Sequence, residues 1–534
     1  MPKAEGGKMK KTITFLVVLM FLSAMSYAQL QIDWQQSYGS MATDIAYDIA
    51  QTDGGYLVVG SAYSGGGQVT CTEVGALWLL KIDNFGNLIW QKCYEHAGAL
   101  RIVKAIGSPY YYLIGGAMGE PYPGTYNLWI AKIDSLGSII WERTLGNTIG
   151  ILGGDQYGEA TADGGVIATA QIDSQGGDIT TWHGWYDGWM IKLDSLGNTD
   201  WDFTIGSSTH IEYINGIIQT SDNGYLAGLY GTPQGAGTGN VDCTTQPTHL
   251  PDAIVFKMDS ISNPEWHRCY GGSGSDGVTR LLEVEDGYII AGWGGSNDGD
   301  LTGSGWHGNK DVWLVRTDFL GNIIWQKCYG GSNSDSPKKI FQTSDGGFMV
   351  FANTNSFDGD VVGNPSSGNA SSIWIFKVNS IGDLLWQQCI GGSRTEQVYG
   401  VIKQNDCKYT VAGEMFYSPS GDVNCSNFVY GSQRNYWVFG ISDTTVNIVE
   451  DSAESFIVKI YPNPANSVLN IDFPNICNIH NTIIKIVDIN GRTMLKSEPV
   501  SISTQLDIKL LTNGLYLVKI QNDISLTTKR IIIQ

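Results

Sequence analysis

Short apolar runs joined by a tight polar turn recur along this chain at a spacing of about 60 residues. In the stretch 311–331, two such runs flank the turn Asp-Phe-Leu-Gly-Asn at 318–322, which is the pattern of a β-hairpin. The same hairpin pattern starts again at other places in the chain: Trp78, Trp129, Trp189, Ile254 and Trp374. A repeat of this length predicts an array of similar small sheets rather than one continuous sheet.

Each repeat contains four apolar runs, which we expect to form strands A, B, C and D. In one repeat these runs lie at 340–343, 347–351, 374–378 and 384–389. Runs C and D are apolar on both faces, as expected for a sheet packed between two neighbours. Four-stranded units of this kind predict an all-β fold, a β-propeller in which each repeat is one blade.

The array has a spare half-repeat at its start and lacks one at its end. The run 33–39 matches a strand D, with Trp34 at the repeated position, but no strand C precedes it. The seventh strand C, at 436–440, has no strand D after it. We therefore expect a seven-bladed propeller over residues 29–443, in which the N-terminal strand completes the last blade. Closure of this kind removes an exposed sheet edge.

The composition fits such a fold and restricts the partners. Only 16% of residues are charged, whereas the chain has 68 Gly and 17 Trp, as expected for many turns around buried aromatic side chains. The formal charge of −20 would repel a nucleic-acid backbone or an anionic membrane. Cationic ligands, calcium and neutral glycans are compatible with this charge.

The N-terminus predicts an export signal in residues 1–28. Lysines precede a short apolar run, and small residues precede a cleavage site after Ala28. Met9 is an alternative start, which would make residues 1–8 an upstream extension. The apolar run is too short for a comfortable membrane span and no other appears, so we expect no span in the mature chain.

The chain changes character after a polar linker at 444–456. Trp disappears, and Ile- and Val-rich runs surround the blocks Tyr-Pro-Asn-Pro at 461–464, Asp-Ile-Asn-Gly-Arg at 488–492 and Asn-Gly-Leu-Tyr at 513–516. In order and spacing these blocks resemble the C-terminal sorting domain of type IX secretion, over residues 457–534. The resemblance implies a small immunoglobulin-like β-sandwich that addresses cargo through the outer membrane. It assigns the sorting motif to Tyr461, Pro462, Asn463, Pro464, Gly491, Gly514 and Tyr516.

The resemblance also implies that the type IX secretion machinery is a partner and that the protein is secreted or displayed on the outer cell surface. The repeat region resembles the seven-bladed propellers of secreted bacterial proteins. It does not match two motifs of propeller enzymes. The turn Asp194-Ser-Leu-Gly197 has one residue more than a sialidase Asp-box, and no adjacent Cys pair is present to cap a quinone. Neither activity is carried over.

Binding residues are expected on one face of the ring. The A–B and C–D turns are short, whereas the B–C loops are long, differ between repeats and share a face with the D–A turns. Long variable loops on a rigid scaffold are where binding residues usually lie. We call this the loop face and the opposite one the turn face.

Two sets of carboxylates fall on the loop face. Acidic residues at the start of strand A would either crowd the mouth of a central channel and attract a cation, or cap their own turns. Asp-Gly-Asp runs in two B–C loops can ligate calcium or form Asx turns, and calcium is the one cofactor these patterns suggest. The first set is Asp44, Asp276, Asp335 and Glu396, and the second is Asp298, Asp300, Asp358 and Asp360.

The loop face also carries aromatic residues outside the repeated positions. Exposed Trp on polar loops can stack on a sugar ring; alternatively, each Trp packs beneath its loop and a His–Asp hydrogen bond fixes it. The sequence Trp-His-Gly occurs twice, and a metal site from both histidines would require non-adjacent blades to meet. The candidate ligand-binding residues are Trp182, Trp185, Trp293, Trp306, His183 and His307.

Nine cysteines in an exported chain allow disulfides. Cys71 and Cys243 lie in B–C loops, and the loop ends near the exit of strand D in its own blade. Cys71–Cys93 and Cys243–Cys269 are therefore candidate pairs.

No nucleophile, general base or isolated carboxylate pair stands out as catalytic, so no catalytic residue is assigned. The leading hypothesis is a non-catalytic binding or adhesion module for extracellular glycan or protein. Two alternatives stay open. One is a propeller-type glycoside hydrolase or lyase that uses loop-face carboxylates, and the other is a structural spacer without a ligand.

Overall fold

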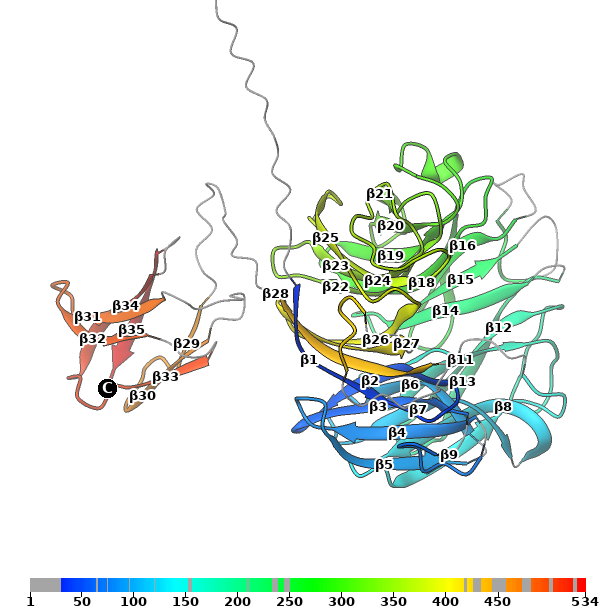
Figure 1. The fold of residues 1–534 in the computed structure, drawn as a ribbon, viewed down its shortest axis with the longest axis horizontal. Helices are drawn as coiled ribbons and strands as arrows, with labels where there is room; N and C mark the ends of the chain where they lie inside the picture. The colour runs from blue at the N-terminus through cyan, green and yellow to red at the C-terminus, as the bar shows by residue number, and fades with distance from the viewer. Residues whose placement is uncertain are drawn as a thin grey trace, which may run out of the picture.

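The computed structural model describes residues 30–534 apart from 64–65, 74, 96, 120, 152–155, 209–210, 233–238, 244–249, 417–419, 426–433, 444–457, 473–481, 499–502 and 522–525. The expected signal peptide 1–28 and linker 444–456 lie outside the described residues, so these boundaries remain predictions. Most of the described chain forms four-stranded antiparallel sheets, which are arranged like the blades of a propeller (Figure 1). The all-β prediction is confirmed.

Six sheets are each built from four consecutive strands in the order A-B-C-D, as the repeat pattern predicts. The first three are β2 Asp44–Thr52, β3 Gly55–Ala62, β4 Ala76–Ile82, β5 Leu88–Tyr94; β6 Ala97–Lys104, β7 Tyr111–Gly119, β8 Tyr122–Ile133, β9 Ile139–Leu145; and β10 Gly158–Ala160, β11 Val166–Ile172, β12 Asp187–Leu193, β13 Thr199–Ile205. The next three are β14 Glu212–Gln219, β15 Tyr225–Gly231, β16 Asp252–Met258, β17 Pro264–Tyr270; β18 Gly277–Val284, β19 Gly287–Gly294, β20 Asp311–Thr317, β21 Ile323–Tyr329; and β22 Asp335–Gln342, β23 Phe348–Thr354, β24 Ser372–Val378, β25 Leu384–Ile390. A short 3₁₀-helix, η1 Gly299–Leu301, lies in the loop between β19 and β20.

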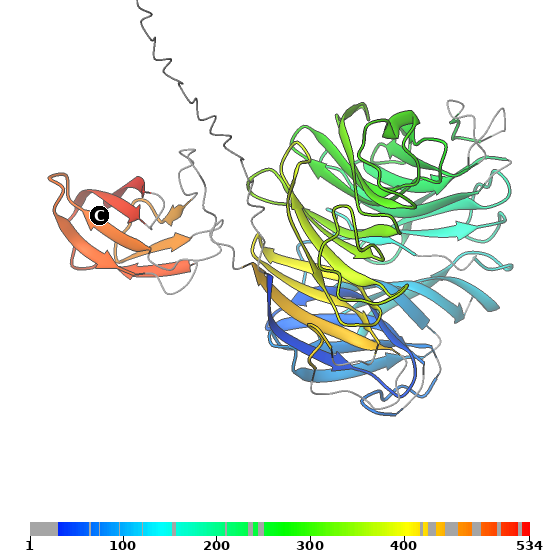
Figure 2. The same cartoon turned by 45° about the horizontal axis from the view of Figure 1, so that its top comes forward.

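The remaining sheet joins the two ends of the repeat region. It consists of β26 Glu396–Asn405, β27 Lys408–Met415, β28 Asn435–Asp443 and the N-terminal strand β1 Leu30–Tyr38. Strand β1 runs antiparallel to β28, with Ser37 opposite Trp437, and the Trp437 indole N–H donates to the Gln35 side chain at 3.2 Å. Figure 2 shows the blue first strand beside the orange last strand of the ring. The predicted closure by the N-terminal strand is confirmed.

The A strands form the inner layer of the ring. Each A strand contacts the A strand of the next sheet, and β26 contacts β2, so the contacts run around a complete circle. The repeated Trp of strand C is buried between sheets, as Trp78, Trp189 and Trp374 show with no exposed surface. Burial of such side chains on both faces of each sheet is the main stabilising contribution of this fold.

The repeated Trp of strand D is less buried than the Trp of strand C. It is half-buried, and in five blades it packs against a glycine in the C–D turn of the next blade. Trp325 illustrates the contact: a Cβ added at Gly382 would lie 2.9 Å from its ring, and Gly382 has φ +81°. The Tyr329 hydroxyl donates to the Gly382 carbonyl at 2.5 Å. Glycine is therefore required in this turn both for its backbone angle and for close approach of the neighbouring blade.

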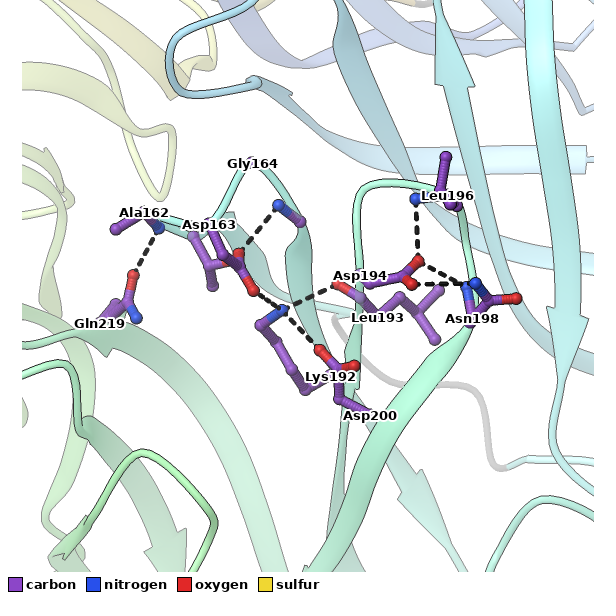
Figure 3. A network of polar contacts seen from close by, with 12 residues as sticks. Ala162, Asp163, Gly164, Lys192, Leu193, Asp194, Leu196, Asn198, Asp200 and Gln219 are labelled. Atoms are coloured by element: carbon purple, nitrogen blue, oxygen red, sulfur yellow. Dashed lines mark hydrogen bonds and ion pairs between the residues drawn. The ribbon is translucent and has the colours of Figure 1, made fainter.

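Charged residues fix the turns on the turn face (Figure 3). Lys192 is buried along its stem, and its ammonium group lies 2.7 Å from Asp163 and 3.1 Å from Asp200. The Asp194 carboxylate accepts the backbone N–H of Asn198 at 2.8 Å and the Asn198 side-chain amide at 2.9 Å, which closes the C–D turn. These contacts are structural, since they satisfy groups within one blade.

The C-terminal region folds as two small sheets with a shared apolar core. One sheet contains β29 Lys459–Tyr461, β30 Val468–Asp472 and β33 Ser503–Asp507, and the other contains β31 Ile483–Val487, β32 Thr493–Ser497, β34 Gly514–Gln521 and β35 Leu526–Ile533. The expected motif residues hold this unit together. Asn463 accepts the Ile532 N–H at 2.9 Å, Gly491 supplies a positive φ in a turn, and the buried Tyr516 donates to the Thr512 carbonyl at 2.8 Å.

Both candidate disulfides are formed. Cys71–Cys93 and Cys243–Cys269 each join a B–C loop to strand D of the same blade, with Cα atoms 5.3 and 5.7 Å apart. In the part of the chain that the structure describes, no helix is long and apolar enough to cross a membrane.

The closing blade has a cysteine at only one of the two positions that form a disulfide in the first and fourth blades. Its B–C loop contains the buried, free Cys425, whose thiol lies 3.3 Å from the Gln35 side chain on β1. The position on β1 that corresponds to Cys93 is occupied by Ser37, since both residues pair with the repeated Trp of strand C. We predict that Ser37→Cys forms a disulfide with Cys425 and raises stability by roughly 2–4 kcal/mol, because it ties the two ends of the ring together.

The measurement is peptide mapping under non-reducing conditions, together with melting curves with and without reductant. Ser37→Ala serves as the control and should show no additional reductant-sensitive gain over the unmodified protein. A free thiol at residue 425 in the Ser37→Cys variant would contradict the pairing of Ser37 with Trp437.

Candidate functional site

The base of the loop face is a set of reciprocal hydrogen bonds between neighbouring blades. At one junction the Asp360 N–H donates to the Gly330 carbonyl at 2.8 Å, and the Asp360 carboxylate accepts the Gly330 N–H at 3.3 Å. The same pair of bonds joins a D–A glycine to a B–C loop residue of the next blade at five other junctions: Gly39–Gln68, Gly146–Asp178, Gly206–Asn240, Gly271–Asp300 and Gly391–Asp422. Six of the seven B–C loops are thereby anchored to the preceding blade.

These bonds account for the Asp-Gly-Asp runs. The second aspartate of each run, Asp300 or Asp360, makes the reciprocal pair just described. The first, Asp298 or Asp358, accepts the N–H of a serine in the same D–A turn, at 2.7 Å in both cases. Among the described residues, no group of three or more His, Cys, Asp or Glu side chains is arranged to hold a metal ion. Calcium binding at these runs stays a prediction.

The acidic residues that begin the A strands are buried at the blade junctions and do not open onto a channel mouth. Each accepts the backbone N–H of the residue four positions earlier: Asp276 from Gly272 at 2.9 Å, Asp335 from Gly331 at 2.9 Å and Glu396 from Gly392 at 2.8 Å. Asp44 binds Ser40, and Glu212 binds Ser207, in a similar way. This is the arrangement of a turn cap, the second of the two alternatives that the sequence left open for these residues.

Three of these caps face a second buried carboxyl, from the first residue of strand C in the preceding blade. A Cβ on Gly271 would lie 2.8 Å from Asp252 and 2.9 Å from Asp276, so both carboxyls pack on one glycine. Burial, reinforced by the charges of Asp276 and Asp300, raises the pKa of Asp252 to about 7. The corresponding pairs are Asp187 with Glu212 and Asp311 with Asp335. Two such carboxyls cannot both be ionised without cost.

The two histidines lie at equivalent places in separate blades. His307 has Nδ1 2.9 Å from Asp311 and Nε2 3.7 Å from Asp360, so it bridges two blades. His183 has Nδ1 3.4 Å from Asp187 of its own blade. Burial raises the pKa of Asp311 to about 6, although the His307 contact acts in the opposite direction. Each histidine therefore belongs to a local His–Asp contact.

The four candidate tryptophans do not form one surface. Trp182 and Trp185 of the third blade are 41% and 62% exposed, and Trp185 has a positive φ of 50°, which is rare for a bulky residue. Trp306 is half-buried against the core of the fifth blade. Trp293 is also half-buried, between the Tyr230 ring at 5.2 Å and the Lys310 ammonium at 5.1 Å. Of these four tryptophans, Trp182 and Trp185 are the two that are largely exposed to solvent.

Some residues near the start of the A strands were not expected from the sequence. Tyr47 and Tyr399 meet edge-to-face at 5.8 Å, and Lys338 lies 5.9 Å from the Tyr399 ring. All three occupy β-bulges, where one extra residue on the A strand shifts its pairing with strand B. A bulge leaves no simple mark in a period-two pattern, so no sequence signal separates these residues from ordinary strand positions.

Comparison with known proteins identifies the family of the C-terminal region. Residues 459–534 match the family described as the secretion system C-terminal sorting domain. This part of the chain is therefore a type IX secretion sorting domain, which implies export to the cell surface or secretion. No curated protein is similar enough in sequence to count as a relative.

Among solved structures, the chain is similar to several with propellers. The β-propeller domain of the Trilobed protease from Pyrococcus furiosus is 9% identical, with 76% of this chain and 100% of that chain covered and a TM-score of 0.40. PorZ, a surface component of the type IX secretion system of Porphyromonas gingivalis, is 11% identical, with 91% and 70% covered and a TM-score of 0.17. Likeness at this level carries no argument about activity or ligand.

The buried carboxyls at the blade junctions predict a dependence of stability on pH. A carboxyl whose pKa is raised in the folded state is protonated there while the unfolded chain is already ionised. Its contribution is therefore full below the ordinary pKa and is lost as pH rises through the folded value. With the pKa values of Asp252, Glu212 and Glu396 at about 7, we expect the melting temperature to rise as pH is lowered from 8 to about 5. Differential scanning calorimetry at intermediate pH values measures this.

A single substitution tests the cause. Asp252→Asn should raise the melting temperature at pH 8 by a few degrees and have little effect near pH 4, because it removes a buried charge only where that charge exists. Two other blades have an asparagine at the equivalent position, Asn127 and Asn435. The control, Asp259→Asn, should instead lower stability at pH 8, since hydrogen bonds from Asn263 hold the pKa of Asp259 below its usual value. Equal effects at both pH values for Asp252→Asn would contradict the assignment.

Proposed function

We propose that the protein is an exported, non-catalytic binding or adhesion module, whose loop face binds extracellular glycan or protein. The observation that carries the proposal is the exposure of Trp182 and Trp185 on one anchored loop. Large aromatic side chains in contact with water cost free energy that burial elsewhere would recover. The positive φ of Trp185 adds backbone strain on the order of 1–3 kcal/mol. Strain and exposure together are characteristic of a residue held for contact with a partner.

A glycan fits this surface better than a charged polymer. The rings can stack on the apolar face of a sugar, while the neighbouring loop offers polar groups for its hydroxyls. Asp202 on strand β13 holds the start of the loop, through the N–H of Thr180 at 2.9 Å and its hydroxyl at 2.8 Å. Anchoring of this kind reduces the entropy lost on binding. A protein partner with an exposed apolar patch would use the same two rings.

The alternative of a glycoside hydrolase or lyase has less support. It needs carboxylates that reach a substrate, yet the carboxyls with raised pKa values at the blade junctions are buried beneath the loops. The pKa of Asp311, at about 6, is the feature that favours it most, because a general acid works best near the operating pH. A spacer without a ligand is the third candidate, and it gives no reason for the strained Trp185.

The test is a glycan array with the mature full-length protein, followed by titration calorimetry on the hits. Trp182→Ala with Trp185→Ala should weaken binding at least ~10-fold, since truncation of a central interface tryptophan typically costs about 2 kcal/mol or more. A matched control is Phe85→Ala, which removes a similarly exposed aromatic ring from the turn face and should leave the affinity unchanged.

Each outcome has a distinct meaning. Retained affinity in the double variant contradicts the role of the third-blade tryptophans. Release of shorter sugars from the same hits, detected by chromatography, supports the hydrolase or lyase instead. The absence of binding to glycans and to surface proteins supports the spacer.

A further inference from the structure

One cysteine of the propeller is bonded outside the two disulfides described above. Seven of the nine cysteines are accounted for as two disulfides and three free thiols: Cys71–Cys93, Cys243–Cys269, Cys328, Cys389 and Cys425. Cys407 is also disulfide-bonded. The sequence leaves a single cysteine that can be its partner within the chain, Cys477. Cys477 lies outside the described residues, in the stretch between β30 and β31 of the sorting domain.

Cys407 lies where the chain leaves the propeller. It is the second residue of the tight turn between β26 and β27 in the closing blade. Its carbonyl accepts the backbone N–H of Asp443 at 2.8 Å, and Asp443 is the last residue of β28. The chain from Asp443 to Lys459, where the sorting domain has its first strand, can extend over roughly 50 Å. The linker is therefore long enough to allow a bond between Cys407 and the sorting domain.

The burial of Cys407 is unusual for its position. The equivalent residue of the fifth blade is Asp286, in the tight turn between β18 and β19, and its side chain is 68% exposed. Cys407 is only 4% exposed. The turn alone does not bury this position, so the difference fits a side chain that is covered by its covalent partner. The A–B turns of the other blades contain no cysteine, so this bond belongs to the blade that adjoins the linker.

We propose that Cys407 forms a disulfide with Cys477 and thereby ties the sorting domain to the closing blade of the propeller. In this step the two thiols lose two electrons and two protons to an external disulfide, which is reduced to two thiols. The export that the sorting domain implies takes the chain out of the reducing cytosol, to where such oxidation occurs. An external dithiol reverses the step and restores both thiols.

The bond changes the effect of a cut in the linker. Without it, a single cleavage between Asp443 and Lys459 releases the sorting domain from the propeller. With it, the two parts stay joined through Cys407 and Cys477 until a reductant is present. The sorting domain therefore has a second attachment to the propeller, and this attachment is sensitive to redox conditions. It does not depend on the proposed binding function of the loop face.

The first test counts the reactive thiols of the full-length protein, unfolded in denaturant with excess alkylating reagent and no reductant. Three cysteines should be alkylated: Cys328, Cys389 and Cys425. Peptide mapping without reduction should recover a linked pair of peptides that contain Cys407 and Cys477. Alkylation of both Cys407 and Cys477 overturns the proposal, and so does a bond from Cys407 to a second copy of the chain.

The second test places the recognition sequence of a specific protease between Ile448 and Val449 of the linker. After cleavage, size-exclusion chromatography in denaturant should show one species of full mass, which separates into two fragments when reductant is added. Cys407→Ser should separate without reductant. Cys425→Ser, the matched control, also removes a buried cysteine of the closing blade and should stay joined until reduction.

Because the fragments are scored in denaturant, the result reports the covalent bond and not the fold of each variant. Separation of the chain with all its cysteines in the absence of reductant overturns the proposal. A Cys407→Ser chain that stays joined after cleavage overturns it as well.

Discussion

The pairing of β1 with β28 is the constraint on which the rest of the propeller depends. Without it, the last sheet would have three strands and an open edge, and the first blade would lose the contact of Trp34 with its C–D turn. The same contacts between neighbouring blades recur around the ring: an aromatic ring of strand D lies on the turn of the next blade, and a D–A glycine pairs with the next B–C loop. Such contacts define a position for each blade only relative to its neighbour. Closure turns a chain of local contacts into a rigid ring that fixes both the loop face and the centre.

The sequence contained enough information to predict this architecture. The hairpin repeat, the spare strand around Trp34 and the cysteine positions are all local patterns, and each corresponds to an observed strand or disulfide. The sorting domain could also be predicted from its sequence blocks, because its turn glycines and capping residues such as Asn463 occur at fixed positions in the chain.

The chemistry of the candidate sites was predicted less well, for physical reasons. Whether the Asp335 carboxyl faces solvent or accepts a backbone N–H depends on how closely two neighbouring blades pack, which the sequence alone does not give. Trp182 and Trp306 share the same motif, yet one is exposed and the other packs on its blade, because the surrounding loops differ. Arg101 on β6 and Arg280 on β18 lie far apart in sequence. Only the closed ring shows that Arg101 and Arg280 stack on one tyrosine.

The late position of β28 in the chain has a consequence for folding order. Leu30 and Asp443 are opposite each other in the closed ring, so their pairing spans almost the entire repeat region. Local hairpins can form as the polypeptide emerges, but this contact has to wait until the final blade has been synthesised. Until then β1 has no partner strand. In the chain, β28 lies directly before the linker and the sorting domain. The strand that closes the ring and the sorting domain are therefore synthesised one directly after the other, at the end of translation.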